Sequence, residues 1–323
     1  MIILLLFVPL FILALIKTLL TPKKLKNLDK KHVVVTGGSS GIGKHAAILA
    51  ARKGANVTII ARNSDRLAAA KKEIEAACIG KDQLISAVSV DVSNRKAISN
   101  ELDSIEDKVG PIYMLINCAG MAICGNVEDF TDKDINTLIN ANYLGCLYPI
   151  QNVVPKFKQR KEGIIVLTGS QVSLMGMYGY SIYSSCKFAL RGLAESIHME
   201  LKPYNVFVTL SLPPDTDTPG FETENKTKPQ ETILISQAGG LYQADTVAEK
   251  LLQDALAGNF FSYVGFDSYV LTTLCVGMSP FTNLLEVMIQ SVILGPLRLM
   301  AAYYTNSFEK IVHKCYLEKE KNK

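Results

Sequence analysis

A tyrosine and a lysine stand four residues apart in the segment YSSCK, where Tyr183 and Lys187 flank three small residues. On a helix such residues share a face, so the Lys187 ammonium would lie one turn from the Tyr183 phenol. A nearby cation favours the phenolate and lowers the pKa of a tyrosine from its usual value of about 10. We therefore expect a phenol that can act as a general acid near neutral pH. The same spacing occurs on ordinary amphipathic helices, so the rest of the chain has to decide between the two interpretations.

A serine, Ser170, precedes Tyr183 by thirteen residues and ends the apolar run GIIVLTGS, which predicts a strand. A hydroxyl at a strand end can donate a hydrogen bond to a substrate oxygen as negative charge develops on that oxygen. Two neighbours, Ser173 and Tyr180, are interpreted as residues of the pocket wall or of a helix start. Cys186 faces a different side of the predicted helix than Tyr183, so a nucleophilic cysteine is not expected.

A glycine-rich turn follows the β-branched run near the start of HVVVTGGSSGIGKHAAILAA and precedes a helical pattern. Glycine permits the tight turn and lets backbone N–H groups approach a pyrophosphate at the N-terminus of the helix. A strand, a glycine-rich turn and a helix in this order predict a dinucleotide site. The residues that we expect to bind the dinucleotide here are Gly37, Ser39, Ser40, Gly41, Ile42 and Gly43.

The second β-branched run, VTIIARN, ends with Ala61 and Arg62. An NAD-binding unit is expected to carry an acidic residue near this point, where it bonds the ribose 2′-hydroxyl. A guanidinium instead suits a 2′-phosphate. Arg62 therefore favours NADPH over NADH as the cofactor.

The runs LISAVSVDVS, YMLINCAG, GIIVLTGS and NVFVTLSLPP are nearly continuous in apolar residues and alternate with helical patterns. Strands covered on both faces have this composition, which predicts an α/β fold with a Rossmann-type, doubly wound parallel sheet. Ligands bind such a sheet beyond the carboxyl ends of its strands. Asp91, Asn117, Ser170 and Pro213 fall at such ends, and we expect Asp91 and Asn117 to contact the cofactor.

The composition limits the classes of function. Of the 323 residues, 48% are hydrophobic and 20% charged, which allows a large core. The net charge is only +4, with no basic cluster interleaved with aromatic residues, so nucleic acid is not an expected partner. The seven cysteines form no C-x-x-C pair, and we expect neither a metal site nor a disulfide framework.

The N-terminal segment is apolar from residue 1 to Ile16, with Lys17 as its only charge up to residue 20. About 20 helical residues span a bilayer core, so residues 1–20 are predicted to be a transmembrane anchor. A cleaved signal peptide is the alternative, but no small-x-small cleavage site follows. Lysines crowd the downstream side, which places the catalytic domain in the cytosol.

Together these motifs resemble the short-chain dehydrogenase/reductase family over roughly residues 31–260, predicted to be an NADP-binding Rossmann domain. The resemblance is carried by TGGSSGIG, DVS, NCAG, NYLG, Ser170 and YSSCK. It implies that Asn142, Ser170, Tyr183 and Lys187 form a catalytic tetrad. It further implies that Lys187 holds the nicotinamide ribose and that Asn142 supports a water-linked proton relay.

One departure from the family pattern lies after the last predicted strand of this domain. The family usually reads P-G there, whereas this chain has PPDTDTPG, with Pro214 in the place of the glycine. Proline fixes φ and removes a backbone donor. Thr216 and Thr218 still match positions that approach the nicotinamide amide and the phosphates, and the resemblance implies that both bind the cofactor.

Within the family the chain is similar to the reductases of long-chain sphingoid ketones, on the segments NCAGMA, KPYNV, PPDTDTPGF and NKTKPQET. This implies NADPH-dependent reduction of the C3 ketone of 3-oxosphinganine to sphinganine. A microsomal hydroxysteroid or retinol dehydrogenase is the alternative enzyme. A non-catalytic NADP-binding membrane scaffold is a third possibility, although it has no need of the tetrad.

The remaining chain holds a predicted lid and a C-terminal extension. Residues 220–232 are polar and poor in helix signals at their centre, and we expect them to cover the acyl chain. The extension, residues 261–323, includes the apolar region 264–305, which is either membrane-embedded or packed on the substrate pocket. Pro280 and Pro296 are expected to break it. The tail EKEKNK resembles a dilysine retrieval signal at Lys319 and Lys321, which implies the endoplasmic reticulum membrane. A homo-oligomer is compatible with all of these features.

Overall fold

The computed structural model describes residues 10–13, 15–16 and 25–321. Most of the predicted anchor, residues 1–20, therefore lies outside the described residues. Within it, residues 10–13 and 15–16 are helical.

The centre of the molecule is a seven-stranded sheet with the order β3-β2-β1-β4-β5-β6-β9. Each neighbouring pair of strands is parallel, which confirms the predicted doubly wound fold. All residues of β1 and β4 are buried, as expected of central strands covered on both faces. The order reverses between β1 and β4, and ligands bind at such a switch point. The strands are β1 (His32–Thr36), β2 (Asn56–Ala61), β3 (Ile85–Ser89), β4 (Ile112–Asn117), β5 (Gly163–Thr168), β6 (Val206–Ser211) and β9 (Phe261–Ser262).

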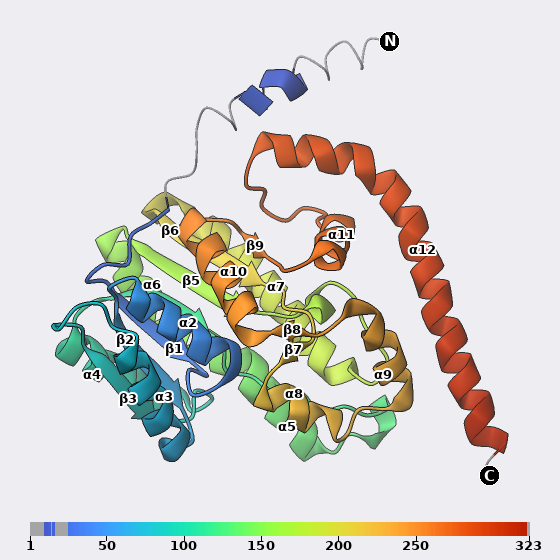
Figure 1. Cartoon of the computed structure of the whole chain (residues 1–323), viewed down its shortest axis with the longest axis horizontal. Coiled ribbons are helices and arrows are strands. Elements are labelled where there is room, and N and C mark those ends of the chain that lie inside the picture. Colours follow the sequence, from blue (N-terminus) through green and yellow to red (C-terminus); the bar gives the residue numbers. More distant parts are fainter. Residues whose placement is uncertain (1–9, 14, 17–24, 322–323) are drawn as a thin grey trace.

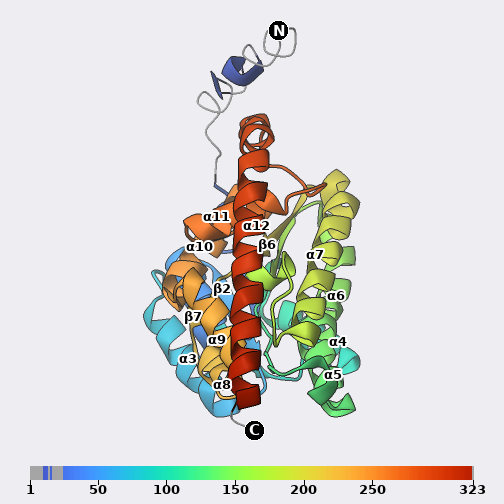
Figure 2. The ribbon, with the colours of Figure 1, turned by 90° about the vertical axis from the view of Figure 1, so that its right-hand side faces the viewer.

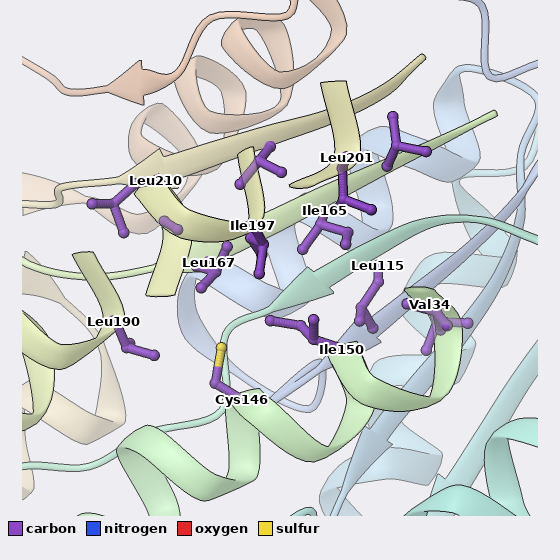
Figure 3. Close-up of a cluster of buried hydrophobic side chains, with 14 of the residues drawn as sticks. Val34, Leu115, Cys146, Ile150, Ile165, Leu167, Leu190, Ile197, Leu201 and Leu210 are labelled. Atoms are coloured by element: carbon purple, nitrogen blue, oxygen red, sulfur yellow. The ribbon is translucent and has the colours of Figure 1, made fainter. Parts of the chain in front are cut away.

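Helices cover both faces of the sheet, as Figure 1 shows. One core lies between the strands and α4, α6 and α7, and a second lies between the strands and α2, α3 and α10. Figure 3 shows part of the first core, where Leu115 and Ile165 of the strands face Ile150 of α6 and Ile197 of α7. The helices are α2 (Gly41–Arg52), α3 (Ser64–Ala76), α4 (Arg95–Val109), α6 (Gly145–Arg160), α7 (Ser181–Leu201) and α10 (Ala244–Ala257).

The segment after β6 forms a cover beyond the carboxyl ends of the strands. It contains a two-stranded pair, β7 (Thr216–Asp217) and β8 (Tyr242–Gln243), and two short helices, α8 (Pro219–Asn225) and α9 (Gln230–Ser236). The predicted lid, residues 220–232, thus consists of α8, a connection at residues 226–229 and the start of α9. The expectation that its centre is free of helix agrees with this structure.

The C-terminal extension consists of α11 (Phe266–Leu274) and the long helix α12 (Leu284–Lys321). Figures 1 and 2 show α12 along one side of the body, where it contacts α11 and α9. Pro296 lies inside α12 without ending it, so the expected break there is wrong. A proline inside a helix removes one backbone hydrogen bond, and the contacts of α12 with α11 and α9 offset that loss. Among the described residues, one helix, α12, is both long enough and apolar enough to span a membrane.

Candidate active site

A cavity of about 1130 Å³ lies beyond the carboxyl ends of the central strands. Its wall combines the glycine-rich turn after β1, the ends of β2, β4 and β5, and the start of α7. Further lining residues come from the segment after β3, from residues 137–141, from the cover after β6, and from α11 and α12. The sequence-predicted residues on this wall are Gly37, Ser39, Ser40, Gly41, Ile42, Gly43, Arg62, Asp91, Ser170, Tyr183, Lys187, Thr216 and Thr218.

The glycine-rich turn has a backbone that only glycine accommodates. Gly37 has φ +68°, and a Cβ there would lie 2.7 Å from the backbone nitrogen of Ala119. Gly41 has φ +54°, and a Cβ there would lie 2.9 Å from Cγ2 of Thr218. Ser40 precedes α2 without a side-chain cap, and the first turn of α2 holds no acidic residue. The turn therefore leaves backbone N–H groups for an anion and fits a pyrophosphate.

Two arginines lie on the cavity wall after β2. Arg62 follows the strand directly, and Arg66 is in the first turn of α3, whose start is capped by Asn63 accepting from the Arg66 nitrogen at 2.8 Å. No sequence motif marks Asn63 and Arg66 as site residues, although Arg66 stands only four residues after Arg62. Two guanidinium groups on one wall fit a phosphate better than a ribose hydroxyl.

Asp91 shares this end of the cavity. Partial desolvation raises the pKa of its carboxyl, but hydrogen bonds from Ser93 and the charge of Arg62 outweigh that effect and lower the pKa. Asp91 Oδ1 accepts from the backbone nitrogen and the hydroxyl of Ser93 at 2.9 and 2.7 Å. The side chain is thus a fixed, ionised acceptor at the rim of the cavity.

Three members of the predicted tetrad meet at the end of β5. Lys187 is buried, and its Nζ donates to the backbone carbonyl of Thr168 at 2.9 Å and lies 5.5 Å from the centre of the Tyr183 ring. The Ser170 hydroxyl lies close enough to the Tyr183 phenol to lower the pKa of that phenol as a hydrogen-bond partner. A phenol, a hydroxyl and an ammonium therefore converge on one point of the cavity.

The pKa of Tyr183 shifts in the direction opposite to the one expected from the sequence. Burial of the phenol raises it, the nearby carboxylate of Glu224 raises it further, and the hydrogen bond with Ser170 lowers it only in part. Burial also lowers the pKa of Lys187 to about 8. The sequence shows the nearby cation but not the desolvation of the phenol, which is the largest effect on its pKa.

Asn142 lies just behind the cavity wall rather than on it. It sits in a π-helical turn (Asn140–Leu144), a local geometry that often marks functional sites. Its Nδ2 donates to the carbonyls of Met121 and Leu138 at 2.8 and 3.0 Å, and its Oδ1 accepts from the Met121 nitrogen at 3.2 Å. Asn142 thereby fixes the loop after β4, whose residues Gly120 and Met121 do line the cavity.

Asn117, at the end of β4, is likewise absent from the wall made by the described residues. Its side chain is 2% exposed, and neither amide atom has a hydrogen-bond partner within the described chain. Thr216 and Thr218 do line the cavity. Thr216 Oγ1 donates to the Pro214 carbonyl at 2.8 Å, and Thr218 Oγ1 accepts from the Phe221 nitrogen at 3.1 Å as the cap of α8.

Of the tetrad's two polar neighbours, Tyr180 agrees with its interpretation from the sequence, whereas Ser173 lies behind the cavity wall and at no helix start. Ser173 is buried, and its Oγ accepts from the Ser170 backbone nitrogen at 3.1 Å. Tyr180 immediately precedes α7, lines the cavity and donates its hydroxyl hydrogen bond to Glu224. Burial raises the pKa of Cys186, which opposes thiolate formation.

One part of the cavity wall is largely apolar and comes from the segment after β5, from α9, and from the C-terminal helices α11 and α12. Both α11 and α12 contribute to this wall, as expected if region 264–305 packs on the pocket, and α12 is also long and apolar enough for the membrane alternative. The cavity that holds the tetrad continues into a second cavity between α9 and α12. Met175, Met177 and Phe308 line both cavities. The apolar residues of this wall include Met175, Met177, Ile235, Phe266, Val270, Leu271, Leu274, Met300 and Phe308.

Comparisons with known proteins give consistent matches. The short chain dehydrogenase family model matches residues 31–229. The chain is 46% identical over 311 residues to 3-ketodihydrosphingosine reductase of Bos taurus, covering 96% of this chain and 93% of that protein. It is 44% identical over 320 residues to 3-dehydrosphinganine reductase of Danio rerio, covering 98% and 96%.

Solved structures match the fold. A short-chain dehydrogenase from Sphingobium yanoikuyae in complex with NADPH is 27% identical, with a TM-score of 0.63, over 72% of this chain and 87% of that one. Levodione reductase has a TM-score of 0.68 over 75% of this chain and 99% of its own, at 21% identity, which shows the fold alone.

Proposed function

The chain belongs to the short-chain dehydrogenase family, and on that premise we propose that it reduces the C3 ketone of 3-ketodihydrosphingosine (3-oxosphinganine) to sphinganine with NADPH. The observation that carries the proposal is the identity of 44–46% to relatives with this reductase activity in their names, over almost the whole chain. The convergence of Ser170, Tyr183 and Lys187 in one cavity supports it.

NADPH, when bound, supplies a hydride for the ketone carbon. The uncapped N-terminus of α2 and the glycine-rich turn suit its pyrophosphate. Arg62 and Arg66 suit its 2′-phosphate, which NADH lacks. Thr216 and Thr218, on the wall at β7 and at the start of α8, are proposed to contact the nicotinamide end.

Tyr183 is proposed to deliver the proton that completes the reduction. Its raised pKa keeps the phenol protonated at neutral pH, so it donates a proton as negative charge develops on the ketone oxygen. The Ser170 hydroxyl donates a hydrogen bond to the same oxygen. The Lys187 ammonium lies beside the phenol, where it stabilises the phenolate that remains.

The membrane is the proposed source of the substrate. A long-chain amino ketone partitions into a bilayer, and the apolar wall formed with α11 and α12 suits its hydrocarbon chain. Helix α12 is long and apolar enough for membrane association. We propose the endoplasmic reticulum membrane, with the catalytic domain in the cytosol.

A substrate panel tests the proposed function. The full-length enzyme in detergent micelles, with NADPH, is given 3-oxosphinganine, a 3-ketosteroid and retinal in parallel. We expect oxidation of NADPH and formation of sphinganine with the first substrate. Turnover of the steroid or retinal, with none of 3-oxosphinganine, would identify a microsomal dehydrogenase of another substrate class instead.

A further inference from the structure

We propose that the carboxylates of Asp215 and Glu224 bind the ammonium group of the amino ketone substrate and so select substrates that carry this group. The inference rests on the proposed function, because it takes the substrate to have an amine on the carbon next to the ketone. It assigns a binding role to two residues outside the tetrad and the dinucleotide site.

The two carboxylates reach the cavity from different elements. Asp215 follows β6 just before β7, and Glu224 lies on α8, and both side chains line the cavity that holds Tyr183. Glu224 accepts the hydrogen bond of Tyr180, whose ring centre is 5.6 Å from that of Tyr183. After burial, the charges of Glu224 and Asp215 are among the causes that raise the pKa of the Tyr183 phenol. Both carboxylates therefore line the same cavity as the proposed proton donor, near enough for their charges to raise the pKa of its phenol.

One buried lysine forms ion pairs with both carboxylates. Lys228 Nζ lies 2.9 Å from Glu224 Oε1 and 3.8 Å from Asp215 Oδ2. Its side chain is 1% exposed, whereas those of Asp215 and Glu224 are 29% and 14% exposed. Lys228 is covered by Phe221, with Nζ 4.4 Å from the ring centre, and does not line the cavity. A ligand in the cavity thus meets the two carboxylates, with their shared cation behind them.

This arrangement has more negative than positive charge. Two carboxyl groups share a single ammonium, and burial together with the charge of Glu224 raises the pKa of Asp215 despite the presence of Lys228. The other lysine on this part of the wall, Lys187, is bonded to the Thr168 carbonyl. A second cation placed between Asp215 and Glu224 from the cavity side would form charge-assisted hydrogen bonds in a site of low dielectric.

The substrate carries such a cation at a suitable place. In a 2-amino-3-ketone the ammonium nitrogen is bonded to the carbon next to the carbonyl carbon. Binding it at Asp215 and Glu224 would therefore hold the carbonyl close to Tyr183 and Ser170. The bound cation would also offset the charges that oppose ionisation of Tyr183, which makes the phenol a better acid in the complex. Steroids and retinoids lack this group, so the same contact distinguishes the substrate classes.

A pair of ketones tests the inference. The kcat/KM of the full-length enzyme is measured with 3-oxosphinganine and with the matching 1-hydroxy-3-ketone that lacks the amine. The ratio compared is kcat/KM for 3-oxosphinganine divided by kcat/KM for the ketone that lacks the amine. We expect Glu224→Gln to lower this ratio about tenfold or more, the size typical for loss of a charged hydrogen-bond partner. Asp215→Asn is expected to act in the same direction. Glu222→Gln is the matched control, since Glu222 is exposed on the same helix.

The outcomes separate the inference from the proposed function. If the parent enzyme reduces both ketones equally well, or if Glu224→Gln and Asp215→Asn leave the ratio unchanged, the ammonium site is refuted while the reductase activity stands. If the parent enzyme reduces neither ketone, the proposed function itself fails. Because both ketones are assayed on the same preparation, a loss of folded protein changes both rates and leaves the ratio intact. NADPH binding, followed by fluorescence, verifies that each variant is folded.

Discussion

The ammonium of Lys187 is bonded to the backbone carbonyl of Thr168, the last residue of β5, at an Nζ–O distance of 2.9 Å. This bond ties the first turns of α7 to the strand end that leads into Ser170. It accounts for the close approach of Ser170 and Tyr183, which are thirteen residues apart in sequence. Lys187 therefore positions the proposed acid as well as lying beside it as a charge.

Removing the phenolic hydroxyl of Tyr183 tests its role as the acid. We expect Tyr183→Phe to lower kcat about 10²-fold to 10⁴-fold, the usual range for loss of a general acid. The affinity for NADPH, measured by fluorescence titration, should change little because the ring remains. Tyr204→Phe, in the turn after α7, is the control and should keep its activity. Full activity of Tyr183→Phe would exclude this residue as the proton donor.

The lowered pKa of Lys187 predicts how activity depends on pH. The ammonium form is needed beside Tyr183, and burial lowers the pKa of Lys187 to about 8. We therefore expect kcat/KM to fall as pH rises through about 8. A profile that stays flat up to the ordinary lysine value of 10.5 would contradict this assignment.

The lowered pKa of Lys187 also predicts how the stability of the fold depends on pH. Between about pH 8 and pH 10.5, Lys187 has lost its proton in the folded protein, while the unfolded chain still binds that proton. Since the unfolded state binds more protons there, this group's contribution to stability rises with pH. The difference in melting temperature between the parent protein and Lys187→Met should move in the parent's favour over this range.

The two arginines after β2 are predicted to set the choice of cofactor. Arg62→Ala and Arg66→Ala should each weaken NADPH binding about tenfold and leave NADH binding nearly unchanged, because only NADPH carries the 2′-phosphate. Titrations with both nucleotides measure this. Arg95→Ala, at the start of α4, serves as the control. Equal affinities of the parent protein for the two nucleotides would refute NADPH specificity.

The end of α12 is predicted to depend on one ion pair. Lys319 Nζ lies 2.6 Å from Oε1 of Glu231 on α9, a carboxylate that is 2% exposed. Lys319→Met leaves that buried carboxylate without its cation, which destabilises the contact between α9 and α12. Hydrogen exchange should become faster in both helices, whereas Lys321→Met, at an exposed position, should have little effect. Unchanged exchange in Lys319→Met would show that apolar packing alone holds α12.

The sequence was sufficient to predict the sheet and the placement of the site. Continuous apolar strands, the glycine-rich turn and polar residues at strand ends are local patterns, and a parallel sheet brings strand ends to one edge by its connectivity. Arg62 follows β2 directly and Ser170 lies two residues after β5, so their positions on the cavity wall are predictable.

Other features depended on contacts that no local pattern records. The continuation of α12 through Pro296 follows from its packing on α9 and α11, and Arg66 joins the wall because α3 starts directly after β2. Asn142 and Asn117 match the family pattern but lie off the wall, because the burial of each side chain is decided by the surrounding loops.

By itself the sequence determined which residue types could do chemistry at the end of the sheet, because strand ends and helix spacing fix their rough positions. Only the tertiary structure decided the electrostatics of Tyr183. Its phenol is desolvated by the folded body, and its pKa is raised further by the charges of Glu224 and Asp215, which follow it by more than thirty residues. A pKa is the sum of such burial and charge effects, and long-range packing supplies most of them.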